Sequence, residues 1–317
     1  MIISSDISQA AAFLQANDVV AIPTETVYGL AANIYSEEAV RKIFEVKERP
    51  LFNPLIVHLH SIEQVEQITI EFPEKARLLA EHFWPGAITL VLKKNDIIPD
   101  LITAGKDTVA VRIPSHPVTL SLLKEIPFPL AAPSANPFNR ISPTRSQHVA
   151  AYFRDKIPMV LEGGACEKGL ESTIVGFEND EAVIYRLGST APEELEKVVG
   201  EIRIRNKKEN TPLAPGMLAK HYSPKTKLYL VDDVINFVNN QENKKIAVLS
   251  FQNSYNSLNI QHIEVLSMKG NLEEAASALY DSLHKLDELD VDMIVAERFS
   301  DEGLGKSIND RLERASK

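Results

Sequence analysis

Residues 19–24 of this 317-residue chain read VVAIPT, a short β-branched run that predicts a buried strand ending in a polar loop of sequence PTET. We expect a helix to follow directly, because Ser36 precedes two glutamates, as at many helix N-termini, and Pro50 closes an apolar stripe. Lys47 and Arg49 then lie at or just past the end of that helix. A strand, a polar loop and a helix in succession indicate an α/β fold whose polar side chains gather at the ends of elements.

Similar patterns continue through the first 200 residues. Alternation or β-branched runs predict strands at 54–61, 87–93, 109–113, 129–134, 159–162, 172–177 and 182–187. Apolar stripes predict helices at 6–16, 73–83, 116–124, 144–153 and 192–199. Because the helices are interspersed irregularly among many strands, we expect a mixed twisted sheet with helices rather than a regular doubly wound sheet.

The pattern changes toward the C-terminus. The runs KLYLVD, KIAVLSF, HIEVLS and VDMIVAERF alternate with helical segments, which is typical of a small Rossmann-like parallel α/β domain. The chain length also favours two domains, since single cores stop growing near roughly 250 to 300 residues. We therefore expect a first domain at 1–200, a linker at 201–225 and a C-terminal domain at 226–317.

The predicted linker, residues 201–225, has two interpretations. It carries six basic and two acidic residues, although the whole chain has a formal net charge of −10. A solvated connector would be kept extended by such charge. The alternative is an active-site lid, in which Pro215 and Gly216 act as a hinge and the polar tips of His221 and Tyr222 cover a bound ligand.

Composition excludes several classes of protein. Hydrophobic residues make up 44% and charged residues 25%, which are globular averages. The single cysteine, Cys166, cannot close an intramolecular disulfide, and no apolar run approaches the roughly 18 residues of a membrane span. We expect a cytoplasmic protein without membrane contact. The net negative charge argues against holding nucleic acid by bulk electrostatics.

Three further features of the sequence are better explained by a structural role than by a catalytic or metal-binding role. GLGKS at 303–307 resembles the end of a phosphate-binding loop, but Ser300 stands where the motif needs glycine, so a loop and helix cap is favoured. His58 and His60 are spaced like two metal ligands without an evident third, which favours a lining or hydrogen-bonded role over zinc. Cys166 has no predicted base beside it and is favoured as a bystander. No metal site is predicted in the protein.

Polar groups at the ends of predicted elements carry the chemical signal. The motifs are KERP at 47–50, TVAVRIP at 108–114 and PSAN at 133–136. Together they supply cations and hydroxyl groups where anionic ligands are usually held. No serine, histidine and acid arrangement is evident, so positioning and charge neutralisation, as in phosphoryl or nucleotidyl transfer, are favoured over covalent catalysis.

An ordered set of motifs gives the chain a family resemblance. PTETVYGLAAN, KERPLFNPLIVH, WPGAITLVL, VRIPSHP, APSANPFNRISPT, ESTIV and YRLG closely resemble the YrdC-like threonylcarbamoyl-AMP synthases. APGMLAKHYSP and GLGKSINDRLERA resemble the two-domain type of that family. The resemblance implies a nucleotidyltransferase that makes L-threonylcarbamoyladenylate and pyrophosphate from L-threonine, bicarbonate and ATP. Mg²⁺ is then carried in with ATP, and downstream transferase proteins modify tRNA next to the anticodon; direct tRNA contact is left open.

The resemblance also implies roles for individual residues. The catalytic signature pairs fall on Lys47, Arg49, Ser134 and Asn136. The threonine-binding positions fall on Thr26, His58, Arg112, Ala132 and Ser172. The ATP-binding positions fall on Arg49, Asn53, Thr108, Ser134, Ser142, Arg186 and Tyr222.

Two rival functions remain at this point. One is a noncatalytic RNA-binding module, which the excess of acidic residues in the first 200 positions weakens. The other is carbamoyl transfer, as in hydrogenase-maturation proteins that contain a YrdC-like domain. That function expects an added acylphosphatase-like or zinc-finger region, and one cysteine is too few for the zinc-finger part.

Overall fold

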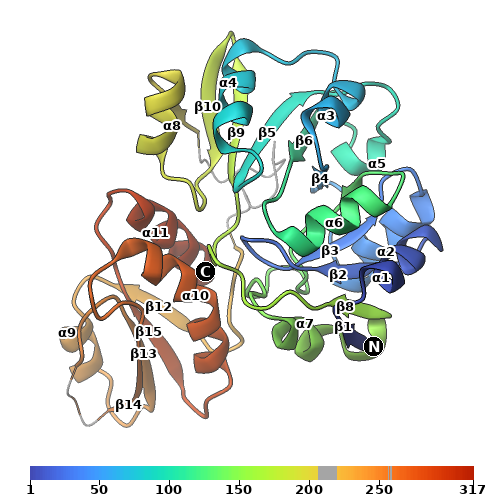
Figure 1. Ribbon diagram of the computed structural model, residues 1–317. Helices are drawn as coiled ribbons and strands as arrows, with labels where there is room; N and C mark the ends of the chain where they lie inside the picture. The colour runs from blue at the N-terminus through green and yellow to red at the C-terminus, as the bar shows by residue number, and fades with distance from the viewer. Residues whose placement is uncertain (206–219, 256, 258) are drawn as a thin grey trace.

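Two β-sheets with their helices make up the protein, in a computed structural model that describes residues 1–205, 220–255, 257 and 259–317 (Figure 1). The first sheet has eleven strands in the order β1-β8-β2-β3-β7-β4-β6-β5-β9-β10-β11. Its strands are β1 Ile2–Ser4, β2 Val20–Ile22, β3 Gly29–Asn33, β4 Ile56–His58, β5 Ile88–Lys93, β6 Thr108–Arg112, β7 Leu130–Ala131, β8 Met159–Leu161, β9 Thr173–Glu178, β10 Glu181–Arg186 and β11 Arg203–Ile204. Parallel and antiparallel pairs both occur, which confirms the predicted mixed sheet.

Most helices of the first unit follow the predicted apolar stripes. They are α1 Ile7–Gln15, α2 Glu37–Lys47, α3 Ile62–Ile68, α4 Glu74–Phe83, α5 Asp100–Thr103, α6 Pro117–Glu125, α7 Ser146–Phe153 and α8 Pro192–Val199, with a 3₁₀ turn at Arg154–Lys156. The Ser36 hydroxyl accepts a hydrogen bond from the Ala39 amide and caps α2, as its sequence predicts. Glu48 ends this helix in the left-handed conformation, and Lys47 is the last helical residue.

The expectation that a helix directly follows the first strand was wrong. Strand β3 lies between them and pairs antiparallel with β2, with Val20 opposite Ala31. Its sequence, GLAAN, has no β-branched residue, so only this pairing reveals it as a strand. Gly29 is needed where β3 approaches the neighbouring segment, because a Cβ there would stand 3.1 Å from the Cβ of Ala132.

Strand β7 is also shorter than the range 129–134 that the sequence predicts. The strand itself contains only Leu130 and Ala131, since Pro129 and Pro133 stand near its ends and proline has no amide hydrogen to donate, and Ser134 pairs with Gly29 only in an isolated bridge. Strand β1 and helices α3 and α5 were not predicted. Each is short, and a few residues carry too little periodicity to identify an element.

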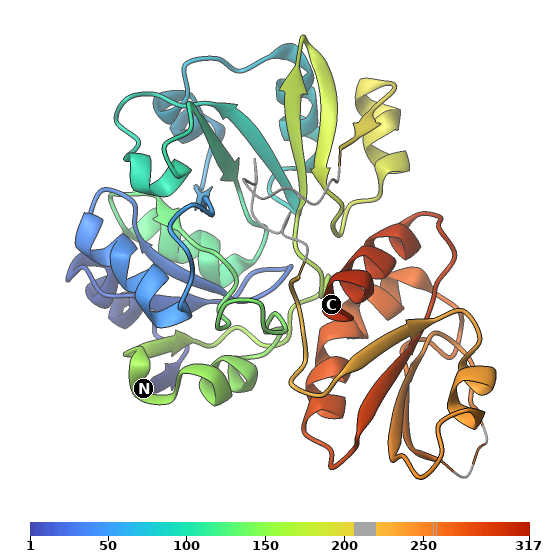
Figure 2. The ribbon, with the colours of Figure 1, turned by 180° about the vertical axis from the view of Figure 1, so that it is seen from behind.

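The second unit is the predicted small parallel sheet. It contains β12 Leu228–Val231, α9 Val234–Asn239, β13 Ile246–Ser250, β14 Ile260–Val265, α10 Leu272–Asp287, β15 Met293–Glu297 and α11 Leu304–Ala315. The strand order is β12-β15-β13-β14, and every pair is parallel. Helices α10 and α11 lie between this sheet and the first unit (Figures 1 and 2). Their apolar core includes Val27, Ile141 and Leu170 of the first unit, so the two units share buried surface.

The range 201–225, predicted as a linker, begins with structure that belongs to the first sheet. Arg203 and Ile204 form β11, which pairs with β10, and Arg203 also forms an ion pair with Glu178. Residues 206–219, which include the predicted hinge at Pro215 and Gly216, lie outside the described residues. Within the described part of the chain, no helix is long and apolar enough to cross a membrane.

Candidate active site

A cleft opens where strands of the first sheet end, and His221 and Tyr222, which precede the second unit, line it as well. Strands β4 and β6 are parallel neighbours in register, with His58 beside Arg112, so both side chains reach the same edge of the sheet. An isolated bridge between Gly29 and Ser134 brings the PSAN segment to the same place. The lining residues are Thr24, Thr26, Val27, Gly29, Arg49, Ile56, His58, Arg112, Ala132, Pro133, Ser134, Glu171, Ser172, Arg186, His221 and Tyr222.

Most of the residues predicted from the family resemblance line this cleft or lie directly behind it. Those that line it are Thr26, Arg49, His58, Arg112, Ala132, Ser134, Ser172, Arg186 and Tyr222. Lys47, Asn53, Asn136 and Ser142 are buried behind the lining residues, where each contacts them or shares their segment. Thr108 is the exception: it lies at the start of β6, opposite Lys93, and lines a separate surface hollow.

Two buried cations on one side of the cleft are paired only with backbone carbonyl groups. The Lys47 ammonium donates to the carbonyl oxygens of Ser134 and Asn136. The Arg49 guanidinium donates to the carbonyl oxygens of Asn53 at 3.3 Å and Pro54 at 2.9 Å. Among the described residues neither cation takes part in an ion pair with a carboxylate. A buried charge without a counter-charge is unfavourable, so this side of the cleft is suited to receive an anion.

The pKa values of these cations reflect their burial. Burial, and then the charge of Arg49, lower the pKa of Lys47 well below its usual value. Burial, and then the charge of Arg186, lower the pKa of Arg49 to about 9, which leaves it protonated at neutral pH. An incoming anion would raise both pKa values again, because it stabilises the charged forms.

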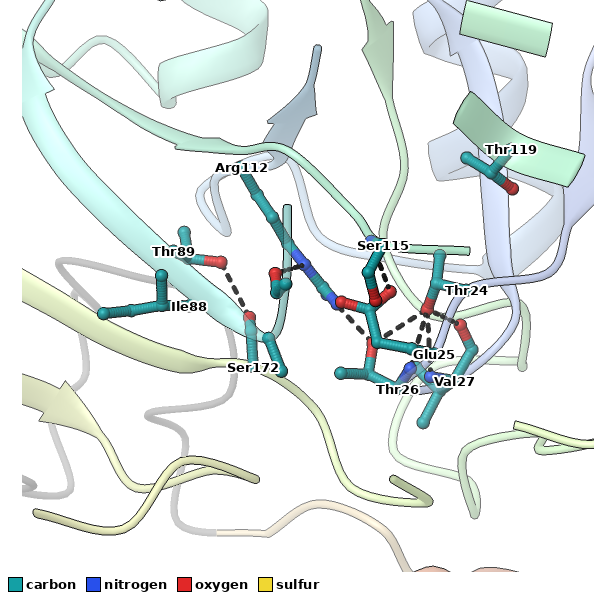
Figure 3. Close-up of polar contacts among 12 residues, drawn as sticks. Thr24, Glu25, Thr26, Val27, Ile88, Thr89, Arg112, Ser115, Thr119 and Ser172 are labelled. Carbon is teal, nitrogen blue, oxygen red and sulfur yellow. Dashed lines mark hydrogen bonds and ion pairs between the residues drawn. The ribbon is translucent and has the colours of Figure 1, made fainter. Parts of the chain in front are cut away.

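Arg186 and Ser172 form the next part of the wall. Arg186 Nη2 donates to the Ser172 carbonyl oxygen at 2.8 Å and to its hydroxyl at 3.1 Å. The Ser172 hydroxyl also lies 2.7 Å from the hydroxyl of Thr89 on β5 (Figure 3). Three strands, β5, β9 and β10, thus meet at a single serine, and its position is set by neighbours distant in sequence.

Another part of the cleft is built around a buried ion pair. Arg112 donates to Glu25 Oε1 at 2.6 Å, to the Thr26 hydroxyl at 2.9 Å and to the Gly86 carbonyl oxygen at 3.1 Å (Figure 3). The Thr24 hydroxyl lies 2.8 Å from that of Thr26. Burial would raise the pKa of Glu25, but the charge of Arg112 and its hydrogen bond lower it. Arg112 is therefore already neutralised, unlike Lys47 and Arg49, and two of its five N–H groups remain for a ligand.

His58 is a neutral imidazole at the floor of the cleft. Burial, and then the charge of Arg112, lower its pKa to about 3. Nδ1 lies 3.2 Å from the Ile56 carbonyl oxygen, and since a carbonyl can only accept, Nδ1 carries the proton. Nε2 is left as a hydrogen-bond acceptor. His60 lies beyond the end of β4 and does not line the cleft, so the two histidines do not act together.

Two acidic residues of the site were missed by sequence analysis. Glu25 lies in the quoted PTET loop and Glu171 opens the quoted ESTIV motif, but neither was assigned a role. The Glu171 carboxylate is buried and accepts hydrogen bonds from Ser142, Tyr280 and Arg311. A glutamate inside an otherwise apolar or hydroxyl-rich motif was the available signal, since a buried carboxylate requires a partner.

Several buried polar atoms in or beside the cleft have no hydrogen-bond partner in the described structure. They include both side-chain polar atoms of Asn53, Nδ1 of His221 and the hydroxyl of Tyr222. Buried polar groups are normally satisfied, so these atoms indicate groups that bind a ligand or water. His221 was named only as part of the predicted lid and here lines the cleft itself.

The described residues contain no cluster of three or more histidine, cysteine, aspartate or glutamate side chains that could hold a metal. Glu171 is unsuited to metal binding, because both of its oxygens already accept hydrogen bonds. In the GLGKS motif Lys306 pairs with Glu193 at 2.7 Å and Ser307 donates to the Gly188 carbonyl oxygen, as expected for a helix start rather than a phosphate loop. Burial raises the pKa of Cys166 to about 12, which agrees with a bystander thiol.

The arrangement defines a class of enzyme. Within the described residues, Lys47 and Arg49 have no carboxylate partner, whereas Arg112 is paired with Glu25. Such a site can hold an anionic substrate beside a zwitterionic one and lower the reaction barrier through position and charge. Residues 12–188 match a family model, Sua5_yciO_yrdC, described as "Telomere recombination", and residues 190–317 match one described as "Threonylcarbamoyl-AMP synthase, C-terminal domain". The chain belongs to the threonylcarbamoyl-AMP synthase family, in its two-domain form.

Individual relatives agree with this placement. The chain is 42% identical over 321 residues to the threonylcarbamoyl-AMP synthase of Pyrococcus abyssi, covering 97% of this chain and 93% of the relative. It is 40% identical over 320 residues to that of Bacillus subtilis, covering 98% and 92%. The structure is similar to the crystal structure of P. abyssi Sua5 complexed with L-threonine, with a TM-score of 0.93, 40% identity, and coverage of 100% of this chain and 98% of that one.

Proposed function

We propose that this protein is a nucleotidyltransferase that forms L-threonylcarbamoyladenylate from L-threonine, bicarbonate and ATP and releases pyrophosphate. The observation that carries the proposal is the division of one cleft into an unneutralised cationic wall and a neutralised polar wall. A triphosphate binds best to the unneutralised cationic wall. An amino acid, which carries both a positive and a negative charge, is suited to the neutralised polar wall. Family membership identifies which amino acid and which nucleotide are meant.

The nucleotide occupies the wall of Lys47 and Arg49, next to Arg186, which is hydrogen-bonded to Ser172. The buried positive charge there stabilises phosphate oxygens in a poorly solvated site, where each charge-assisted hydrogen bond contributes about 1.5 to 3 kcal/mol. The unpartnered atoms of Asn53 and Tyr222 lie on this side and supply polar contacts for the nucleotide. Ser134, Asn136 and Ser142 belong to the same half. Thr108 can contribute to ATP binding only if part of the ATP molecule extends beyond the cleft.

Threonine occupies the wall of Thr26, His58, Arg112, Ala132 and Ser172. The two remaining N–H groups of Arg112 suit the threonine carboxylate, and Glu25 keeps the guanidinium fixed in orientation. The acceptor atom of His58 suits a donor on threonine, either its ammonium or its hydroxyl group. The crystal structure of P. abyssi Sua5 contains L-threonine, which supports an amino-acid site in this fold.

The chemistry needs no nucleophile from the protein. The threonine amine adds to bicarbonate with loss of water and forms a carbamate. A carbamate oxygen then attacks the α-phosphorus of ATP, the bond between this phosphorus and the bridging oxygen to the β-phosphate breaks, and pyrophosphate leaves with the electron pair. The protein contributes by holding carbamate and triphosphate in line and by neutralising the charge that develops on the leaving oxygens.

The remaining roles belong to the proposal as well. Mg²⁺ enters with ATP as part of the substrate, bound by its phosphate oxygens. Downstream transferase proteins in the cytoplasm take up the product for tRNA modification. The catalytic domain comprises 1–200 and the C-terminal domain 226–317. Tyr222, in the connecting range 201–225, covers the nucleotide and excludes water from the mixed anhydride.

The test is the release of pyrophosphate from ATP by the purified full-length chain. We expect release only when threonine and bicarbonate are both present. Release that is unchanged when threonine is omitted would contradict the proposal. Binding of tRNA without any binding of ATP would favour the noncatalytic RNA-binding module instead.

A further inference from the structure

Arg311, on α11 of the C-terminal unit, extends into the first unit and is almost fully buried there. Its Nε donates to Glu171 Oε2 at 2.9 Å and its Nη2 donates to the Leu187 carbonyl oxygen at 2.7 Å. Its Nη1 donates to Asp310 at 2.8 Å, on its own helix. The guanidinium therefore connects two segments of the first unit and one acid of the second.

The two segments that Arg311 connects are next to the cleft. Glu171 immediately precedes Ser172, and Leu187 immediately follows Arg186. Ser307, one turn earlier on α11, donates to the Gly188 carbonyl oxygen at 2.7 Å. The helix therefore holds the backbone on either side of the hydrogen bond between Arg186 and Ser172.

Glu171 also connects Arg311 to Ser142, on the nucleotide side of the cleft, by hydrogen bonds. Its Oε1 accepts a hydrogen bond of 2.6 Å from the Ser142 hydroxyl, and Tyr280 on α10 donates to both of its oxygens at 3.1 and 3.0 Å. If Arg311 were absent, the carboxylate would face the phosphate site with its nearest compensating charge removed. Such a charge would repel ATP, since both are negative and poorly screened.

Arg311 also supports Tyr222. The guanidinium carbon of Arg311 lies 4.9 Å from the centre of the Tyr222 ring. The centre of the Tyr280 ring, on α10, lies 5.8 Å from the centre of the Tyr222 ring. The backbone of Tyr222 has φ of 61°, a left-handed conformation that a residue with a large side chain keeps only when its surroundings require it. The preceding amide, of His221, donates to the Arg314 carbonyl oxygen on α11 at 3.3 Å.

A supporting role fits the relatives that are shorter. The threonylcarbamoyl-AMP synthase of Pseudomonas putida aligns over 98% of its own length with only 58% of this chain, at 32% identity. That relative is complete without a second unit of this size, so the C-terminal unit is not expected to supply a reacting group. It can, however, set the geometry of the site in chains that have it.

We infer that Arg311 is a positioning residue through which the C-terminal unit shapes the nucleotide side of the cleft. It acts on Ser142 and Ser172 through its hydrogen bond to Glu171, and on Arg186 through its hydrogen bond to the neighbouring Leu187. It acts on Tyr222 by lying against the aromatic ring. The inference rests on the proposed function. It assigns the C-terminal unit a definite part in ATP binding, in addition to its packing against the first unit.

The test compares Arg311→Gln with Lys306→Gln in the full-length chain, measuring pyrophosphate release over a range of ATP and threonine concentrations. Both residues lie on α11 and both contact the first unit, but Lys306 pairs with Glu193 at the rim of the interface. We expect Arg311→Gln to raise the KM for ATP by about tenfold or more, with a smaller effect on the KM for threonine. Lys306→Gln should leave both values within about twofold.

A second substitution separates positioning from loss of folding. Adding Glu171→Gln to Arg311→Gln removes the unpaired carboxylate and should recover part of the affinity for ATP, a result that general destabilisation would not produce. Tyr280→Phe removes the hydroxyl that donates to Glu171, keeps the ring in the core, and should raise the KM for ATP by about two- to fivefold. It keeps the test decisive if Arg311→Gln fails to fold.

The inference is overturned if Arg311→Gln and Tyr280→Phe change the melting temperature but leave the KM for ATP unchanged, or if Lys306→Gln has the same effect as Arg311→Gln. Failure of the proposed function is distinct. It appears in the unsubstituted protein, as an absence of pyrophosphate release that depends on threonine.

Discussion

Replacing Arg49 with methionine should reduce activity strongly while changing stability little. Arg49 is buried, and among the residues that the structure describes its guanidinium donates hydrogen bonds only to the carbonyl groups of Asn53 and Pro54. Burial, with repulsion from Arg186, lowers its pKa from 12.5 to about 9. That difference corresponds to a cost on the order of 5 kcal/mol for keeping the charge in the folded protein without a ligand.

Two effects of Arg49→Met therefore oppose each other. Removing the charge recovers much of this cost, whereas losing two charged hydrogen bonds costs about 1.5 to 3 kcal/mol each. The net change in the free energy of unfolding should lie within about 2 kcal/mol of zero. Activity should fall further, because one phosphate contact of the same strength corresponds to a loss of roughly tenfold to a hundredfold in kcat/KM.

Arg112→Met provides the matched comparison. Arg112 is equally buried but paired with Glu25 at 2.6 Å, so its removal leaves an uncompensated carboxylate and should destabilise the protein by about 3 to 5 kcal/mol. Denaturant unfolding measures the stability of both variants, and pyrophosphate release measures their activity. If Arg49→Met is destabilised as much as Arg112→Met and loses activity only in step with folding, Arg49 is a structural residue and the reasoning is wrong.

Three further predictions concern buried groups. The pKa of His58 and of His148 is lowered to about 3 and that of His284 to about 4, with burial as the main cause. Below about pH 6.5 the unfolded chain takes up these protons while the folded protein does not. The free energy of unfolding is therefore highest above that pH, and as the pH falls below it should decrease by up to about 1.4 kcal/mol per pH unit for each histidine. A melting temperature that stays constant from pH 7 to pH 5 would contradict this, and His148→Phe should reduce the slope. Tyr222→Phe removes a buried hydroxyl that has no hydrogen-bond partner among the described residues. It should raise the melting temperature of the ligand-free protein but weaken ATP binding, which calorimetry can measure; stronger binding would refute the assignment. Cys166, with its pKa raised to about 12 by burial, should not react with iodoacetamide in the native protein, and rapid labelling would show that the thiol is accessible.

Much of the fold follows from local patterns in the sequence. The longer helices and strands, such as α2, α8, β5 and β6, agree with their predicted ranges to within a few residues, because each carries a full apolar stripe, a cap or a β-branched run. The parallel C-terminal sheet was predicted for the same reason, since its apolar runs alternate regularly with helices. The chemical character of the site was also predictable, as cations and hydroxyl groups stand at element ends in KERP and PSAN.

Tertiary structure decided which of those groups are available to a ligand. Sequence does not distinguish Arg49 from Arg112. In the described part of the chain, Arg49 donates only to carbonyl oxygens, whereas Arg112 is neutralised by Glu25, a residue 87 positions away. Strand β3 is likewise defined by its partner β2 rather than by its own residues. The contact between Arg311 and Glu171 spans 140 positions. Side-chain type and spacing are local properties of the chain, whereas burial, charge pairing and unsatisfied polar atoms depend on distant segments that only folding brings together.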